Sequence, residues 1–259
     1  MDTQYFDALR GLGLGLVFLL IIMAESIHPH TRMHRPLQTN LGLWLVDTML
    51  TRVVCGACGL VVAAWAVING FGALQMLQLP LWVTLLISVI MLDLVSWMWH
   101  LANHHVPWLW RLHRVHHADR AFQVTTALRF HPGELLLSLP VRLLAIVLIG
   151  IPVEGVLLFE IVFGAMNLWV HANYSLPERL DRAVGSVLIT PSLHRLHHAR
   201  STTMVNRNFG TIFSVFDRAL GTITRSPAAA QFGTGVVAPD GDQQMSLLTA
   251  LKSPFTFRA

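Results

Sequence analysis

The sequence has few charged side chains. Asp, Glu, Lys and Arg make up 12% of its 259 residues, whereas 54% of the residues are hydrophobic. Soluble domains carry about 25% charged residues, so the composition favours a membrane protein over an ordinary soluble domain. The formal net charge is only +4, and no basic run carries interleaved aromatic residues. We therefore expect a membrane environment and no nucleic-acid partner.

Cysteine is almost absent as well. The only two cysteines, Cys55 and Cys58, form a CxxC pair inside an apolar run, and no second pair follows. We interpret them as small residues of a membrane helix rather than as a redox or zinc motif. The sequence also lacks an HExxH motif, a dinucleotide-binding glycine fingerprint and a ferredoxin cysteine set. These absences weigh against a zinc peptidase and indicate that electrons for any redox reaction come from a separate protein.

Long apolar stretches are abundant by contrast. Five of them approach the roughly 20 residues that a membrane-spanning helix needs; they cover residues 11–24, 53–68, 80–99, 135–151 and 153–170. The predicted fold is all-α: an integral membrane bundle of four to five transmembrane helices with a cytoplasmic, histidine-rich helical cap. We expect N-terminal membrane helices and an interfacial loop in residues 1–79, a histidine-containing catalytic core in 80–225, and a loosely ordered tail in 226–259.

The arginines predict the orientation of this bundle. Most of them occur in residues 25–52, in 103–133 and throughout the region after His171, whereas residues 69–79 contain no charge and the turn at Pro152 is short. Cytoplasmic loops of membrane proteins are enriched in Lys and Arg. The arginine-bearing regions, and the histidines within them, are therefore expected to face the cytoplasm.

Histidine is the most unusual component, with 14 residues. Eight of them fall into clusters with spacings of three and four, which place side chains on one face of a helix, and His171 is a ninth candidate. The nine are His100 and His104, the HxxHH cluster His113, His116 and His117, the HxxHH cluster His194, His197 and His198, and His171 at the end of the fifth stretch. Nine imidazoles exceed the needs of one ion, and nitrogen-rich sites with open positions suit iron and O2 chemistry. We therefore predict a site for two metals.

Three further residues are candidates for supporting this site. Asp93 lies two helical turns before His100, and a carboxylate within a membrane helix usually has a function; we expect it to accept a hydrogen bond from a ligand imidazole, the alternative being an ion pair with an arginine. His131 has three interpretations: a group behind the ligands, a tenth ligand, or the first residue of a helix. Asn167 either binds metal through water or supports helix packing, and we favour packing. The remaining histidines, His28, His30, His34 and His105, lack the spacing and are not expected to be ligands.

The order of these motifs resembles a known superfamily. The relevant segments are residues 93–104, 107–117, 126–132, 190–198, 208–210, 216–217 and 221–222. Together they resemble the fatty acid hydroxylase/sterol desaturase superfamily across roughly residues 80–225. The resemblance implies a histidine-bound di-iron centre with two Fe ions, O2 as cosubstrate and a lipid substrate. The expected activity is hydroxylation or desaturation of a C–H bond in a fatty acyl, sterol-like or carotenoid lipid, with an external ferredoxin or cytochrome-type electron donor.

Two other interpretations of the histidines stay open. A non-oxidative zinc protein, either a membrane hydrolase or a structural scaffold, would also use imidazole ligands. A haem-binding electron-transfer protein would need only two axial histidines and would leave the other seven without a role. Metal content measured together with activity distinguishes these classes, because overexpressed sites of this kind acquire zinc.

The predicted orientation can be tested with reporter fusions. A reporter fused after His117, and one fused at the C-terminus, should both be active only in the cytoplasm because both follow arginine-rich segments. An extracytoplasmic signal from either fusion would contradict the predicted topology.

Overall fold

The computed structural model describes residues 3–31, 37–54, 57–201, 203–225, 234 and 245–256. Within these residues the secondary structure is helical, apart from two isolated β-bridges, Leu188 with Phe213 and Ala199 with Thr234. The helices are α1 (Thr3–Ile27), α2 (Leu37–Val54), α3 (Cys58–Ile68), α4 (Ala73–Leu77), α5 (Leu81–His105), α6 (Pro107–His117), the 3-10 helix η1 (Val124–Leu128), α7 (Pro132–Ile149), α8 (Val153–Val170), α9 (Glu178–Val184), α10 (Pro191–His197), α11 (Val215–Ala219) and α12 (Leu247–Thr256). The predicted all-α class is confirmed.

Five helical regions are long and apolar enough to cross a membrane. They are Ala8–Ile27, Leu37–Leu77, Leu81–His105, Pro132–Ile149 and Val153–Val170. Many of their large apolar side chains are exposed, such as Leu12 and Trp82 at 71% each, as expected of surfaces that contact lipid tails. The predicted helical membrane bundle is therefore confirmed at five candidate spans.

Two elements differ from their expected form. Residues 37–54 were expected to belong mainly to an arginine-bearing loop, but they form helix α2 and join α3 and α4 in the second apolar region. Residues 226–259 were expected to form a loosely ordered tail, but residues 247–256 form helix α12. Cys58 begins α3 and is half-buried, whereas Cys55 lies outside the described residues. The proposed domain boundaries after residues 79 and 225 stay predictions.

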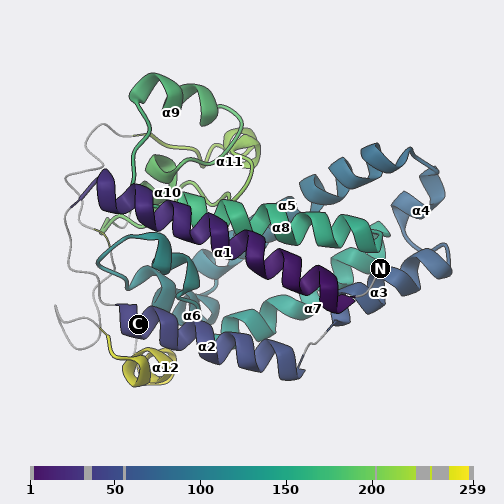
Figure 1. Cartoon of the computed structure of the whole chain (residues 1–259), viewed down its shortest axis with the longest axis horizontal. Helices are drawn as coiled ribbons and strands as arrows, with labels where there is room; N and C mark the ends of the chain where they lie inside the picture. The colour runs from purple at the N-terminus through teal and green to yellow at the C-terminus, as the bar shows by residue number, and fades with distance from the viewer. Residues whose placement is uncertain are drawn as a thin grey trace. The chain divides into compact units, whose positions relative to one another are not determined.

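The chain divides into two compact units, which we describe separately. The first contains Met1–Leu37, His117–Leu128 and Ile161–Gln244. Within it, α1 runs beside the part of α8 that belongs to this unit, from residue 161 onward (Figure 1), and the side chains of Val17 and Phe18 pack against buried Val124, Ala127 and Leu168. This apolar contact joins the first span to the end of the last one, from which His171 follows directly.

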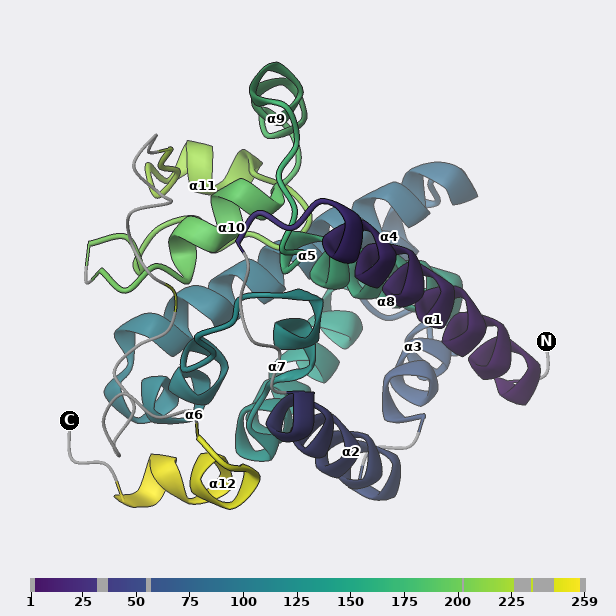
Figure 2. The same cartoon turned by 60° about the vertical axis from the view of Figure 1, so that its left-hand side comes forward.

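The second unit contains Gln38–His116, Arg129–Glu160 and Met245–Ala259. Its centre is α7, which packs against α3 and α5. At one end, α12 lies beside the start of α2 (Figure 2), where the Thr39 hydroxyl donates to the carbonyl of Met245 at 2.8 Å. The last turn of α5 and most of α6, with four of the predicted histidine ligands, belong to this unit.

The turn between α3 and α4 depends on a close approach of two glycines. Gly72 has a φ of 101°, and a Cβ at this position would collide with the backbone of Gly150, the residue that caps α7. Gly150 itself has a φ of 75°. A side chain at residue 72 would therefore force the α3–α4 turn away from the end of α7.

We expect Gly72→Ala to destabilise the protein strongly. The substitution combines an unfavourable φ with a backbone collision, so its cost should be about 3 kcal/mol or more. Gly70→Ala is the matched control, because Gly70 also has a positive φ (58°) but has open space around it; its cost should be about 1–2 kcal/mol. Thermal unfolding of the detergent-solubilised variants measures the difference, and equal melting temperatures would contradict the packing argument.

Candidate metal centre

The second unit gathers three histidines from two helices. His100 and His104 lie on the last turns of α5, and His113 lies on α6, which starts afresh at Pro107. The Nε2 atoms of His100 and His113 are 3.1 Å apart, and the rings of His104 and His113 have centroids 4.9 Å apart. Each of the three offers a nitrogen within 4.8 Å of the others. The i,i+4 pair and the first histidine of the HxxHH cluster thus converge as the spacing predicts.

The first unit gathers a second set of buried histidines. Its members are His117, His171, His194, His197 and His198, each at most 2% exposed. The Nε2 atoms of His171 and His194 are 3.0 Å apart. The rings of His117 and His198 stack with centroids 4.3 Å apart. Segments separated by about 80 residues in sequence therefore bring their imidazoles together within this unit.

Hydrogen bonds to backbone carbonyls fix the tautomers of three imidazoles. The Nδ1 atoms of His116, His171 and His197 donate to the carbonyl oxygens of Arg129 (3.2 Å), Asn167 (2.7 Å) and Arg207 (2.7 Å). A carbonyl oxygen only accepts, so Nδ1 carries the proton and Nε2 presents its lone pair. This is the arrangement that metal-binding imidazoles require, because the second ring nitrogen orients the ligand.

His113 differs from these three histidines because the acceptor for its Nδ1 atom is a carboxylate. Its Nδ1 lies 2.9 Å from Oε1 of Glu134, in the first turn of α7. The amide of Asn103 donates to the same oxygen at 2.9 Å. Glu134 stands three residues after His131 in the sequence His-Pro-Gly-Glu, but the sequence alone did not indicate its contact with His113.

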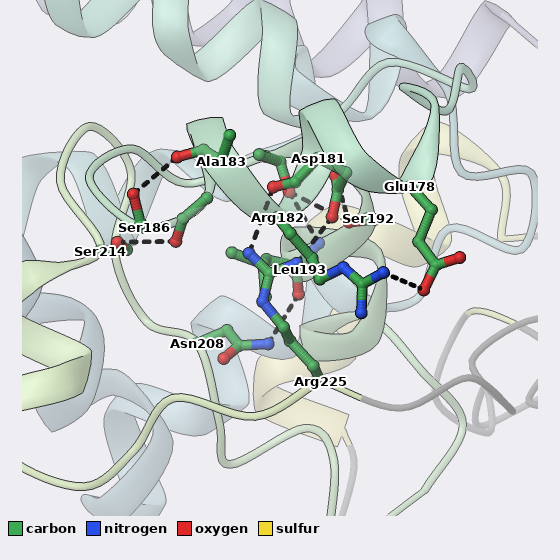
Figure 3. Close-up of polar contacts among 12 residues, drawn as sticks. Glu178, Asp181, Arg182, Ala183, Ser186, Ser192, Leu193, Asn208, Ser214 and Arg225 are labelled. Carbon is green, nitrogen blue, oxygen red and sulfur yellow. Dashed lines mark hydrogen bonds and ion pairs between the residues drawn. The ribbon is translucent and has the colours of Figure 1, made fainter.

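Helix α10, which carries His194 and His197, is fixed at its start by side chains outside the histidine clusters. Thr190 caps the helix by accepting the amide of Leu193. The hydroxyl of Ser192 donates to Asp181 at 2.6 Å, and Arg225 pairs with the other oxygen of the same carboxylate at 2.8 Å (Figure 3). The Thr-Pro-Ser-Leu stretch before His194 therefore orients the helix rather than binding metal.

The segment after α10 is organised by Asn208 and Asp217. Asn208 has a φ of 56°, and its amide donates to the carbonyl of Leu193 at 2.9 Å. Asp217 accepts hydrogen bonds from the amides of Phe209 and Gly210 and from the hydroxyl of Thr222. These contacts hold the chain beside the Arg207 carbonyl, the acceptor for His197.

A buried arginine links α10 to the end of α8. Arg195 donates to the carbonyls of Ala172 (3.1 Å) and Tyr174 (2.9 Å). Burial lowers the pKa of Arg195 to about 10, and the carboxylates of Asp181 and Glu25 partly offset this effect. Arg195 therefore stays charged at neutral pH and ties His194 to the segment that follows His171. No feature of the sequence other than its place between the ligands indicated this role.

The structure shows where the supporting candidates lie. His131 caps α7: its Nδ1 accepts the amide of Gly133 at 3.0 Å, and its Nε2 donates to the carbonyl of Leu251 at 3.2 Å. Both ring nitrogens are thus used at the start of a helix, which was one of the three interpretations. The amide of Asn167 donates to the carbonyl of Ala127 at 3.2 Å, as the packing interpretation requires.

Asp93 is buried in α5, 1% exposed, and its bond to a ligand imidazole stays a prediction. The histidines not expected to be ligands lie outside both groups in the described part of the chain. His105 is exposed and donates to the carbonyl of Leu101, and His30 contacts Ser175. His34 lies outside the described residues.

The donor atoms fit a transition metal. Imidazole nitrogen suits Fe, Cu, Ni and Zn, whereas Ca and Mg prefer oxygen. Each imidazole nitrogen lies about 2.0–2.1 Å from a bound ion such as zinc, so pairs separated by 3.0–3.1 Å are close enough to share one ion. Cys58, the described cysteine, belongs to neither group, unlike the cysteine-rich structural zinc sites.

The fold and these residues define a polytopic helical membrane protein with clustered histidines that could hold a metal ion. The chain belongs to the fatty acid hydroxylase family, whose model matches residues 85–222. No solved structure shows significant similarity to the chain.

Several curated proteins of known name are similar to the chain. Ornithine lipid hydroxylase OlsE of Rhizobium tropici is 27% identical over 183 residues, which is 69% of this chain and 52% of that protein. Cholesterol 25-hydroxylase of Homo sapiens is 28% identical over 157 residues, 57% of this chain and 53% of that protein. Alkylglycerol monooxygenase of Danio rerio is 27% identical over 174 residues, 64% of this chain and 36% of that protein. The chain thus spans about half the length, or less, of these relatives.

The assignment of the ligands predicts a division among the histidines. His113→Ala and His197→Ala should each lower the metal content of the purified protein, because each deletes an imidazole that a neighbouring acceptor holds in place. His105→Ala and His28→Ala should keep the wild-type metal content, since both side chains are exposed. Elemental analysis of the four folded variants makes the comparison, and equal losses in all four would show that the wrong histidines were chosen.

Proposed function

We propose that the protein is an O2-dependent oxidoreductase that hydroxylates a C–H bond of a membrane lipid, with desaturation as the second candidate reaction. The observation that carries this proposal is the convergence of imidazoles within each unit, where one pair of Nε2 atoms lies 3.0–3.1 Å apart. Family membership and the similarity to relatives that are all hydroxylases or monooxygenases support hydroxylation in particular.

The nine candidate histidines are the proposed ligands of two iron ions. His116 and His117 are consecutive on α6 and point about 100° apart, so we assign them to different ions. Iron in such a site would supply the O2 chemistry that no protein side chain can perform alone. We assign Asp93 and Asn167 supporting roles and give His131 no role in binding metal, because both of its nitrogens are committed at the start of α7.

The residues of the chain perform three tasks in this proposal. The carbonyl acceptors and Glu134 hold the imidazoles in one tautomer and one orientation. Burial of His117, His171, His194, His197 and His198 keeps bulk water away from the reacting groups, which suppresses side reactions. Arg195 and Asp181 keep α10 in place, so that the positions of the His194 and His197 side chains stay fixed when substrate binds.

The substrate class follows from the membrane and from the relatives. The relatives are named for ornithine lipid, cholesterol and alkylglycerol, all of which are amphiphilic lipids. We propose that this protein likewise takes an amphiphilic lipid, fatty acyl or sterol-like or carotenoid, directly from the bilayer. The arginine distribution supports placing the histidines on the cytoplasmic side, where an external ferredoxin or cytochrome-type donor would supply electrons.

A zinc hydrolase or scaffold is the alternative function. It would use the same imidazole donors, but structural zinc sites are satisfied by four ligands, which leaves five of the nine histidines without a role. Two metal ions, each with an open coordination position, give a role to all nine histidines.

Lipid analysis with isotopically labelled dioxygen tests the proposed reaction. Cells that express the wild-type protein should accumulate a lipid carrying one labelled oxygen atom, whereas cells that express His197→Ala should not. A product with one more double bond and no label would indicate desaturation. A lipid profile identical in wild-type and variant cells, or a product labelled only from water, would contradict the oxidative function.

A further inference from the structure

Glu134 joins three helices of the second unit through one oxygen atom. The residue lies in the first turn of α7 and is 4% exposed. Its Oε1 atom is 2.9 Å from Nδ1 of His113 on α6 and 2.9 Å from Nδ2 of Asn103 on α5. His113 and Asn103 are also buried, 2% and 1% exposed. Burying a carboxylate this deeply costs free energy unless hydrogen bonds replace its lost hydration.

The direction of the two hydrogen bonds follows from the donors. The amide nitrogen of Asn103 can only donate, so Oε1 of Glu134 acts as an acceptor there. The Nδ1 atom of His113 then donates to the same oxygen, which leaves Nε2 of His113 with its lone pair. That Nε2 atom faces Nε2 of His100 at 3.1 Å. The carboxylate therefore selects the tautomer that a metal ligand needs.

The local sequence explains how Glu134 reaches this position. His131 caps α7, Pro132 occupies the first helical position, and Glu134 occupies the third. A carboxylate in the first turn is favoured by the partial positive charge of the helix N-terminus. A Cβ at Gly133 would lie 3.1 Å from Nδ1 of His131 and 3.2 Å from the side chain of Leu112, so a larger residue there would crowd both side chains. The His-Pro-Gly-Glu stretch is thus a helix start that delivers a carboxylate.

We infer that Glu134 is a positioning residue that orients His113 and increases its basicity as a metal ligand, an inference that rests on the proposed metal-binding function. His116, His171 and His197 use neutral carbonyl oxygens as their acceptors. A charged acceptor makes a stronger hydrogen bond and a more basic imidazole. Glu134 therefore makes His113 a stronger nitrogen donor than these three ligands.

Cobalt(II) binding to metal-depleted, detergent-solubilised protein tests this inference without depending on turnover. Glu134→Gln keeps the size of the side chain and removes the charge, so we expect cobalt affinity about 10–100-fold weaker than wild type. The visible absorption bands of the bound cobalt should also shift. Glu154→Gln is the matched control, since Glu154 lies in the first turn of α8 but is exposed; it should bind as wild type does.

A double-mutant cycle separates positioning from a merely structural role. If Glu134 acts through His113, Glu134→Gln should cause no further loss of cobalt affinity in a His113→Ala background. The melting temperature of the metal-free protein should be the same with and without Glu134→Gln. Equal losses in both backgrounds, or wild-type affinity for Glu134→Gln, would overturn the inference.

A second variant covers the case in which Glu134→Gln does not fold. Glu134→Asp keeps the charge but withdraws the oxygen by one methylene, so it should also weaken cobalt binding; wild-type affinity would overturn the inference. Failure of the wild-type protein to bind cobalt or iron would contradict the proposed metal centre itself. Unchanged cobalt affinity in the Glu134 variants, with normal binding by the wild type, would contradict only the role assigned to Glu134.

Discussion

An imidazole has two nitrogens, and a metal site needs both of them. One must present its lone pair to the ion, and the other must donate its proton to a fixed acceptor that holds the ring in place. In this chain the acceptors for His116, His171 and His197 are carbonyl oxygens of the backbone. The positions of three separate backbone segments are therefore part of the proposed metal site, and much of the surrounding structure keeps these segments in place.

The residues that fix these segments need not touch a metal. Asn208 adopts a left-handed conformation beside the Arg207 carbonyl, and Asp217 collects the amides that follow it. Asp181 and Arg195 hold the two ends of α10 through Ser192 and through the carbonyls after His171. These side chains explain why the motifs of the family extend well beyond the histidines. These side chains fix the positions of the backbone carbonyls, and the carbonyls in turn orient the imidazoles.

The sequence was sufficient for the features that depend on pattern. Long apolar runs predicted the membrane-spanning helices, and spacings of three and four singled out the clustered histidines as candidate ligands, an assignment that stays a prediction. The sequence was insufficient where the backbone supplies the function, because a carbonyl acceptor can come from any residue type. Glu134 and Arg195 were missed since their roles depend on which helices pack together, and the helix start at His131 was one of three interpretations. The extent of α2 was missed because its apolar part is short and flanked by arginines, and α12 was missed because its ten residues were grouped with the rest of the tail.

The central claim is that the histidines hold two irons. Iron content and Mössbauer spectra of protein expressed with iron-57 and purified without oxygen test it most directly. We predict about two irons per folded chain, in nitrogen-rich environments, with lipid oxidation that rises in proportion to iron content. One iron per chain, a haem spectrum, or full lipid-modifying activity in protein that contains zinc and no iron would contradict the account.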